Sequence, residues 1–258
     1  MKKNILLMSL ASLLSLSSCH GILDDIYDDA DSGATEDKDG VLTVDASSWT
    51  DWHYIDFSEL RNSLASENTP GVITCSIPIE ASGDTIHDET AEKQTGIYLR
   101  WYDVFGEGLS RNEFRSFYPT AAHAEPQDWD IAVHRNNVRT NGGAVYETQL
   151  TSMDDLPESS ESYAEELFVK DEWNTTDVWA VQDQMLQGII GNQGTYINNV
   201  LSSWLSIHIP PMPPRYEHNN HVFIVRLADG THAALQLANY QSTKGVKCYL
   251  TINYKYPY

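Results

Sequence analysis

The clearest pattern of apolar and polar positions lies near the C-terminus. Residues 222–227 form an apolar run, and residues 233–240 form a second one after an Asp229-Gly230 pair. An Asp-Gly pair between two apolar runs is typical of a tight β-hairpin turn. From residue 246 to residue 255 apolar side chains alternate with polar ones, which is the period of a strand with one buried face. The pattern predicts an antiparallel meander.

A second hairpin is expected further towards the N-terminus. Residues 129–134 form a predicted strand, which we expect to run towards Asn141-Gly142-Gly143 and to return through Val145. These segments lack a strong period of 3.6 residues, and no helical crossovers separate them. We therefore predict an all-β fold of mainly antiparallel strands, arranged as two packed sheets, with long ligand-bearing loops and little helix.

The first residues have the pattern of an export signal. Lys2 and Lys3 precede an uncharged apolar run over residues 5–16, and Leu16, Ser17 and Ser18 then lead to Cys19. The run is shorter than the roughly 20 residues that a membrane-spanning helix needs, and small residues before a cysteine indicate a cleavage site. The sequence thus predicts a signal peptide over residues 1–18 and a lipid anchor on Cys19, on a bacterial protein exported from the cytoplasm.

Composition divides the mature chain into a tether and one domain. Residues 19–40 are rich in Asp, Gly and Ser and hold little that could form a core, so we interpret them as an acidic, extended tether. Residues 41–258 form the predicted β domain. The formal net charge of the full sequence is -21, which disfavours nucleic acid as a partner. Cys75 and Cys248 remain after lipidation, and either a disulfide or two free thiols fits an exported protein.

Several segments together resemble the HmuY family of haem-binding lipoproteins, or haemophores. The resemblance covers most of the mature domain and is poor between about residues 68 and 125. It implies an HmuY-like β fold in which two loop-borne side chains clamp the iron of haem b. It also implies capture of haem for iron acquisition and delivery to a TonB-dependent receptor of the outer membrane. The segments that carry it are residues 44–49, 51–57, 128–135, 139–145, 222–226, 228–230 and 254–258.

Two methionines are the candidate axial ligands of the iron. His, Met, Cys and Tyr side chains ligate haem iron, and only Met153, Met185 and Met212 follow the predicted cleavage site. Met185 lies in an apolar segment that ends in glycines, in the region of the family's first ligand. Met212 lies between two pairs of prolines, in the region of the second. Prolines stiffen a loop and keep it out of a strand ladder.

Alternatives to this ligand pair remain open. His208 is a rival to Met212, because a gapless alignment to the family's histidine-ligated pattern places Ile209 at the second ligand and His208 one residue away. Both methionines could also serve as ordinary packing. We assign no metal to the other histidines of the predicted domain, which are His53, His87, His123, His134, His218, His221 and His232.

The surroundings of the two methionines suit a pocket for a large apolar ligand. Trp173, Trp179, Tyr196 and Trp204 flank the candidate loops, with Trp204 better interpreted as core, and Tyr216 is a candidate partner for a haem propionate. No sequence signature of catalysis is present, so we predict a binding protein and no enzyme. The alternative functions are a surface lipoprotein that binds glycans on exposed tryptophans, of which the chain has seven, and a structural or adhesive surface subunit.

Overall fold

The fold is that of a computed structural model that describes residues 40–63, 71–88 and 93–258. The predicted signal peptide, Cys19 and all of the predicted tether except Gly40 lie outside these residues. Within them, none of the helices has both the length and the apolar character needed to span a bilayer. The first strand of the domain begins at Val41, and the last one ends at Lys255.

The largest sheet has six antiparallel strands in the order β1-β18-β17-β16-β8-β9. The predicted C-terminal meander is confirmed, because β16, β17 and β18 are neighbours in this sheet. Cys248, Leu250, Ile252 and Tyr254 of β18 are buried, as the alternation indicates. The strands are β1 (Val41–Asp45), β8 (Ala144–Glu147), β9 (Val169–Lys170), β16 (Phe223–Arg226), β17 (His232–Gln241) and β18 (Lys247–Lys255).

The turn between β16 and β17 follows from its Asp-Gly pair. Gly230 has φ +87°, a conformation that costs glycine little because it has no Cβ. The Asp229 carboxylate accepts hydrogen bonds from the backbone N–H and the hydroxyl of Thr231, at 2.8 and 2.7 Å. These contacts fix the turn and with it the register of the hairpin.

The remaining strands form two four-stranded sheets and two two-stranded sheets, rather than the single second sheet that we expected. One sheet has the order β3-β2-β6-β7: β2 (Asp51–Ile55), β3 (Val72–Ser76), β6 (Ile131–His134) and β7 (Asn137–Thr140). The other has the order β11-β12-β4-β5: β4 (Gly96–Asp103), β5 (Gly108–Pro119), β11 (Trp179–Val181) and β12 (Ile189–Gln193). The two-stranded pairs are β10 (Glu172–Asn174) with β13 (Thr195–Ile197), and β14 (Leu205–His208) with β15 (Arg215–His218).

Within residues 40–63, 71–88 and 93–258, helices are few and short. The α-helices are α1 (Phe57–Ser63) and α2 (Asn199–Ser202). Four 3₁₀ turns are η1 (Met153–Asp155), η2 (Ser160–Ser162), η3 (Glu165–Leu167) and η4 (Met185–Gln187). The described domain is therefore mainly antiparallel β, as predicted.

The predicted second hairpin is wrong in its turn and in its returning strand. β6 turns at Arg135 and Asn136, since His134 pairs with Asn137 and the chain returns as β7. Arg135 takes φ +54° to make this two-residue turn. The later Gly142-Gly143 pair instead lets the chain leave the sheet and enter β8, which pairs with β16 in the six-stranded sheet. The Gly142-Gly143 pair therefore marks the point where the chain passes from one sheet to another, and not a hairpin turn.

The central strands β2 and β6 of the sheet β3-β2-β6-β7 are buried on both faces, so they organise the core. Ile131 and Val133 of β6 face the main core, which also contains Trp204, fully buried as expected for a packing residue. Ala132, which points to the opposite face, joins a second core with Trp52 of β2. This alternation along one strand couples the six-stranded sheet to the β11-β12-β4-β5 sheet.

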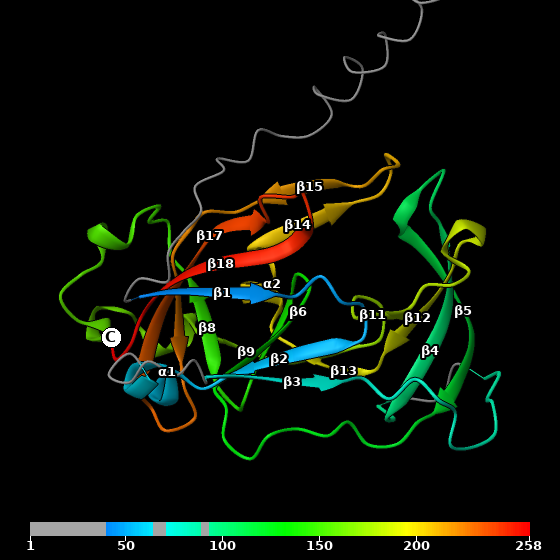
Figure 1. Cartoon of the computed structure of the whole chain (residues 1–258), viewed down its shortest axis with the longest axis horizontal. Coiled ribbons are helices and arrows are strands. Elements are labelled where there is room, and N and C mark those ends of the chain that lie inside the picture. Colours follow the sequence, from blue (N-terminus) through cyan, green and yellow to red (C-terminus); the bar gives the residue numbers. More distant parts are fainter. Residues whose placement is uncertain (1–39, 64–70, 89–92) are drawn as a thin grey trace, which may run out of the picture.

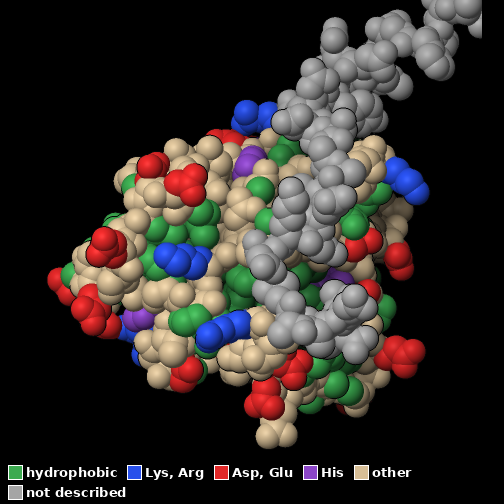
Figure 2. All heavy atoms as spheres, turned by 60° about the vertical axis from the view of Figure 1, so that its left-hand side comes forward, with side chains coloured by type: hydrophobic (Ala, Val, Ile, Leu, Met, Phe, Trp, Pro, Cys, Tyr) green, Lys and Arg blue, Asp and Glu red, His purple; other side chains and the backbone are tan. Residues whose placement is uncertain are grey.

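Figure 1 shows the resulting arrangement. The six-stranded sheet occupies the left half of the view and the β11-β12-β4-β5 sheet the right, and the β14–β15 hairpin reaches along the top towards β4 and β5. On the face drawn in Figure 2, acidic side chains are spread over the periphery with a few basic ones among them. Cys75 and Cys248 are both free thiols, and they lie in or against different cores.

Candidate functional site

A cleft of about 520 Å³ opens where the β14–β15 hairpin approaches the β11-β12-β4-β5 sheet. Its volume lies in the range of about 300–1,000 Å³ that is usual for small-molecule sites. Seven parts of the chain line it: the segment before β2, the β4–β5 hairpin, the β6–β7 turn, the segment that leads into β11, the loop around η4, the segment from the end of β13 through α2, and the β14–β15 hairpin. Representative lining residues are Trp49, Tyr102, Arg135, Met185 and Met212.

Met185 reaches the cleft from the 3₁₀ turn η4. The turn ends at Gly188, which has φ +77° and whose N–H donates to the Met185 carbonyl at 2.9 Å. The Gly188 carbonyl in turn accepts a hydrogen bond of 2.7 Å from the backbone N–H of Tyr102 in β4. The loop is therefore fixed to the sheet directly beside the half-buried methionine.

Met212 reaches the same cleft from the proline-rich loop between β14 and β15. The backbone N–H of Leu109 in β5 donates to the Ile209 carbonyl at 3.3 Å, and Gly108 packs so closely that a Cβ there would overlap this carbonyl oxygen. Met185 and Met212 both pack, half-buried, against one small apolar cluster that includes Tyr102 and Ile209. The structure thus brings together two methionines that are 27 positions apart in the sequence.

His208 is not among the residues that line the cleft. It is the last residue of β14, where its Nε2 lies 2.8 Å from the Glu217 carboxylate of β15 and its side chain is 38% exposed. Its neighbour Ile209 is 7% exposed and lines the cleft. This difference follows from the alternation of side chains along an extended chain.

Aromatic rings form one wall of the cleft. Trp49 and Trp179 stack with their ring centres 5.9 Å apart and their planes at 16°. The ring centre of Tyr102 lies 6.0 Å from that of Trp179, and the Tyr102 hydroxyl donates to the Thr176 carbonyl at 2.9 Å. Burial raises the pKa of Tyr102, so the phenol stays neutral. The wall is apolar, rigid and able to contact a flat ligand.

His134 and Arg135 add polar groups to the cleft. His134 is fully buried, its Nε2 lies 2.9 Å from the Trp49 carbonyl oxygen, and its Nδ1 has no partner among the described residues. Burial lowers the pKa of His134 to about 4, so the imidazole is neutral at pH 7. Tyr216, the proposed propionate partner, also lines the cleft, and burial raises the pKa of its phenol.

Three of the other histidines have local hydrogen-bond partners. His53 Nδ1 lies 3.0 Å from the Thr74 hydroxyl, His218 donates to the Leu237 carbonyl at 2.5 Å, and His221 Nδ1 lies 2.7 Å from the Glu147 carboxylate. In the described part of the chain, no group of three His, Cys, Asp or Glu side chains is placed to hold a metal ion.

Sequence reasoning found Met185, Met212, Trp179 and Tyr216 in the cleft but missed other parts of it. Trp173 and Tyr196, which also flank the loops, pair with each other on β10 and β13 and do not line the cleft. The missed residues are Trp49, Tyr102, His134 and Arg135. Arg135 directly follows the strand predicted over residues 129–134, but no local pattern placed it at the cleft.

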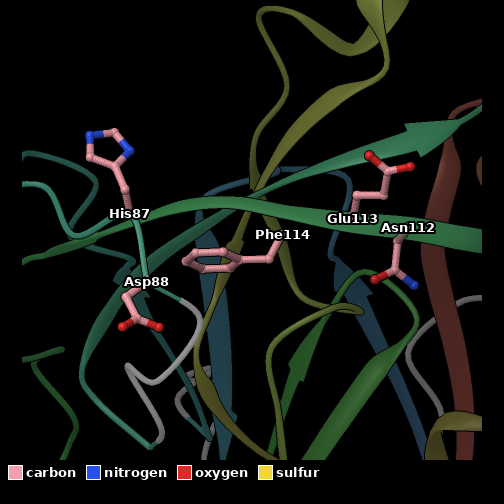
Figure 3. A pocket seen from close by; sticks show the side chains of 5 residues that line it. All are labelled: His87, Asp88, Asn112, Glu113 and Phe114. Atoms are coloured by element: carbon pink, nitrogen blue, oxygen red, sulfur yellow. The ribbon is translucent and has the colours of Figure 1, made fainter.

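A second hollow, on β5, does not have the features of a site. It is lined by His87, Asp88, Asn112, Glu113 and Phe114. Figure 3 shows that Glu113 and Asn112 point to opposite sides of the strand, and that His87 and Asp88 extend in different directions from a separate segment. The polar groups do not converge on one point, so the first cleft is the candidate site.

The fold and the cleft define an all-β protein with an apolar cleft that presents two methionine side chains. The family model "HmuY protein" matches residues 48–254, which is most of the sequence. The chain therefore belongs to the HmuY family. No curated protein sequence matches it.

Solved structures agree with this assignment. A candidate lipoprotein from Bacteroides fragilis is 27% identical, with 87% of this chain and 94% of that chain covered and a TM-score of 0.59. A candidate HmuY-like haem-binding protein from Bacteroides vulgatus is 29% identical, covers 87% and 97% of the two chains, and also has a TM-score of 0.59. The apo HmuY analogue of Tannerella forsythia, 19% identical over 83% of this chain and 93% of that chain, has a TM-score of 0.55 and is similar in fold.

Proposed function

We propose that this protein is a haemophore that binds haem b in the cleft, with Met185 and Met212 as the axial ligands of the iron. The observation that carries the proposal is the convergence of both methionines on one apolar cleft. The family match and the 29% identical candidate haem-binding protein from Bacteroides vulgatus support haem as the cargo. The alternative ligand His208 is disfavoured because its imidazole is engaged by Glu217 outside the cleft.

The cleft residues have distinct tasks in this proposal. The thioether sulfurs are soft ligands, which favour ferrous over ferric iron relative to imidazole. The stacked Trp49 and Trp179 rings contact the face of a flat macrocycle and exclude water. The buried cluster around Tyr102 and Ile209 holds both methionine-bearing loops in place. Capture and release of haem need no bond cleavage, so the proposed carrier is not an enzyme.

The proposal includes a location and a route for the cargo. A lipid on Cys19 would anchor the protein to the outer membrane, with the acidic tether placing the domain at the cell surface. The similarity to a candidate lipoprotein from Bacteroides fragilis supports this anchor. Haem would then pass to a TonB-dependent receptor in the same membrane. Detergent phase partition tests the anchor, since Cys19→Ala should move the protein from the detergent phase to the aqueous phase.

A haem titration of the purified protein tests the ligand pair. We expect a one-to-one change in the Soret band that is sharpest after reduction with dithionite and is lost in Met185→Ala and in Met212→Ala. Met153→Ala is the matched control, because Met153 packs against a different cluster, far from the cleft lining. If Met212→Ala left the spectrum intact and His208→Ala abolished it, the second ligand would be His208.

A glycan-binding surface is not favoured by the positions of the tryptophans. All seven lie within the described residues, and none is among the exposed large apolar side chains. Trp52 and Trp204 are fully buried. A sugar platform needs an exposed ring, so haem remains the function that the cleft supports best.

A further inference from the structure

Arg135 is a buried cation at the edge of the candidate cleft. It occupies the β6–β7 turn and is only 7% exposed. One terminal nitrogen of its guanidinium donates to the Ser47 carbonyl at 2.7 Å, and the central carbon lies 3.6 Å from the centre of the Trp49 ring. Among the described residues it is the only buried lysine or arginine.

No carboxylate compensates this charge within the described part of the chain. Arg135 forms no ion pair there, and its Nε–H has no hydrogen-bond partner. Arg139, which is also largely buried, pairs with Glu125 at 2.6 Å. The full chain carries 37 acidic residues against 16 basic ones, so a buried arginine without a carboxylate partner is unexpected. A buried charge without a partner is costly, and buried charges are normally paired.

The position of Arg135 directs the unpaired guanidinium to the cleft. Arg135 and Tyr216 both line the cleft, and burial raises the pKa of the Tyr216 phenol while the positive charge of Arg135 opposes this rise. The one acidic residue of the lining, Asp177, is engaged elsewhere. Its carboxylate accepts hydrogen bonds from the Asn174 amide at 2.7 Å and from the Thr176 hydroxyl at 2.8 Å. The ligand is therefore the remaining source of a negative charge that can pair with the Arg135 guanidinium.

We propose that Arg135, with Tyr216 beside it, is a specificity-determining residue that binds a carboxylate of the cargo. The inference rests on the proposed function, since it takes the cargo to be a tetrapyrrole. It adds that the cleft selects macrocycles with free carboxylates over their esters. Because this contact does not involve the iron, it applies equally to an iron-free porphyrin, which the two methionines cannot ligate.

Titrations of two ligands into two forms of the protein test the inference. Iron-free protoporphyrin IX and its dimethyl ester are titrated into wild type and Arg135→Gln, with quenching of tryptophan fluorescence as the readout, since Trp49 and Trp179 line the cleft. We expect wild type to bind the diacid roughly 10- to 100-fold more tightly than the diester, the range of a charge-assisted hydrogen bond. The preference should vanish in Arg135→Gln.

Control variants separate this inference from the ligation of the iron. Arg135→Lys keeps the charge and should retain part of the preference for the diacid. Such a result would show that the loss of the preference in Arg135→Gln does not come from a folding defect. Met153→Ala, at a methionine outside the cleft lining, should retain all of the preference. An equal preference for the diacid in wild type and Arg135→Gln would overturn the role of Arg135, even if haem still bound through the methionines. Conversely, a wild-type protein that shows no Soret change with haem but keeps its preference for the diacid would overturn the methionine pair alone.

Discussion

Acidification should destabilise the ligand-free protein through His134. The imidazole is fully buried, and burial lowers its pKa to about 4. The contact with the Trp49 carbonyl opposes this shift, whereas the positive charges of Arg135 and His53 add to it. In the unfolded chain the same imidazole has its ordinary pKa of about 6.5. Between these two values the unfolded state binds a proton that the folded state does not.

The magnitude follows from the difference between the two pKa values. At roughly 1.4 kcal/mol for each pH unit, the difference corresponds to about 3 kcal/mol. This contribution to the free energy of unfolding is fully present above about pH 6.5 and is lost as the pH falls to about 4. It is a substantial part of the roughly 5–15 kcal/mol that stabilises a typical domain.

Asp130 acts in the opposite direction over nearly the same range. Burial raises the pKa of its carboxyl to about 6, although a 2.8 Å hydrogen bond from the Phe57 backbone N–H lowers it in part. The folded state therefore binds a proton more readily than the unfolded state does, and the contribution of Asp130 grows as the pH falls. Because Asp130 is partly exposed, solvent screening makes its contribution the smaller of the two.

Urea unfolding between pH 4 and pH 7 separates the two residues. In His134→Gln, in which the amide can still donate to the Trp49 carbonyl, the loss of stability on acidification should shrink by about 3 kcal/mol relative to wild type. In Asp130→Asn the loss should become steeper. A His134→Gln variant that loses as much stability as wild type over this range would refute the assignment of a neutral buried imidazole.

Three further outcomes are expected. Gly108→Ala should weaken haem binding about tenfold or more without changing a ligand, because its Cβ would overlap the Ile209 carbonyl and displace the Met212 loop; calorimetric titration measures this. Asp171→Ala should lower the free energy of unfolding by about 2–4 kcal/mol in urea, because its carboxylate binds the Thr140 N–H and hydroxyl at 2.7 and 2.9 Å. Haem at 100 times its Kd should stabilise the fold by about 2.7 kcal/mol and raise Tm by several degrees, which a thermal scan detects.

The sequence predicted those parts of the fold that depend on local pattern. The turn at Asp229-Gly230 and the alternation from Cys248 to Tyr254 each lie within about ten residues, and both were confirmed. The turn at Arg135 was missed, because an arginine with positive φ has no strong sequence signal. The Gly142-Gly143 pair gave a strong signal for a hairpin turn, but its conformational freedom lets the chain pass from one sheet to another.

The candidate site was predictable only in part. Met185 and Met212 were found through composition, since few methionines remain after the predicted cleavage site, and through resemblance to a family. Their convergence depends on contacts between β4, β5 and two distant loops, which no local pattern contains. Trp49 and Arg135 were missed for the same reason, because Trp49 meets Trp179 and Arg135 only after the sheets have packed.

The hairpin of β4 and β5 has a mechanical consequence for the two methionines. The loop of Met185 is tied to it by the hydrogen bond between Tyr102 and Gly188, and the loop of Met212 by the one between Leu109 and Ile209. The hairpin therefore couples the two methionine-bearing loops mechanically. A movement of its tip would shift both sulfurs together, so under the proposed ligation both methionines would leave the iron in one step.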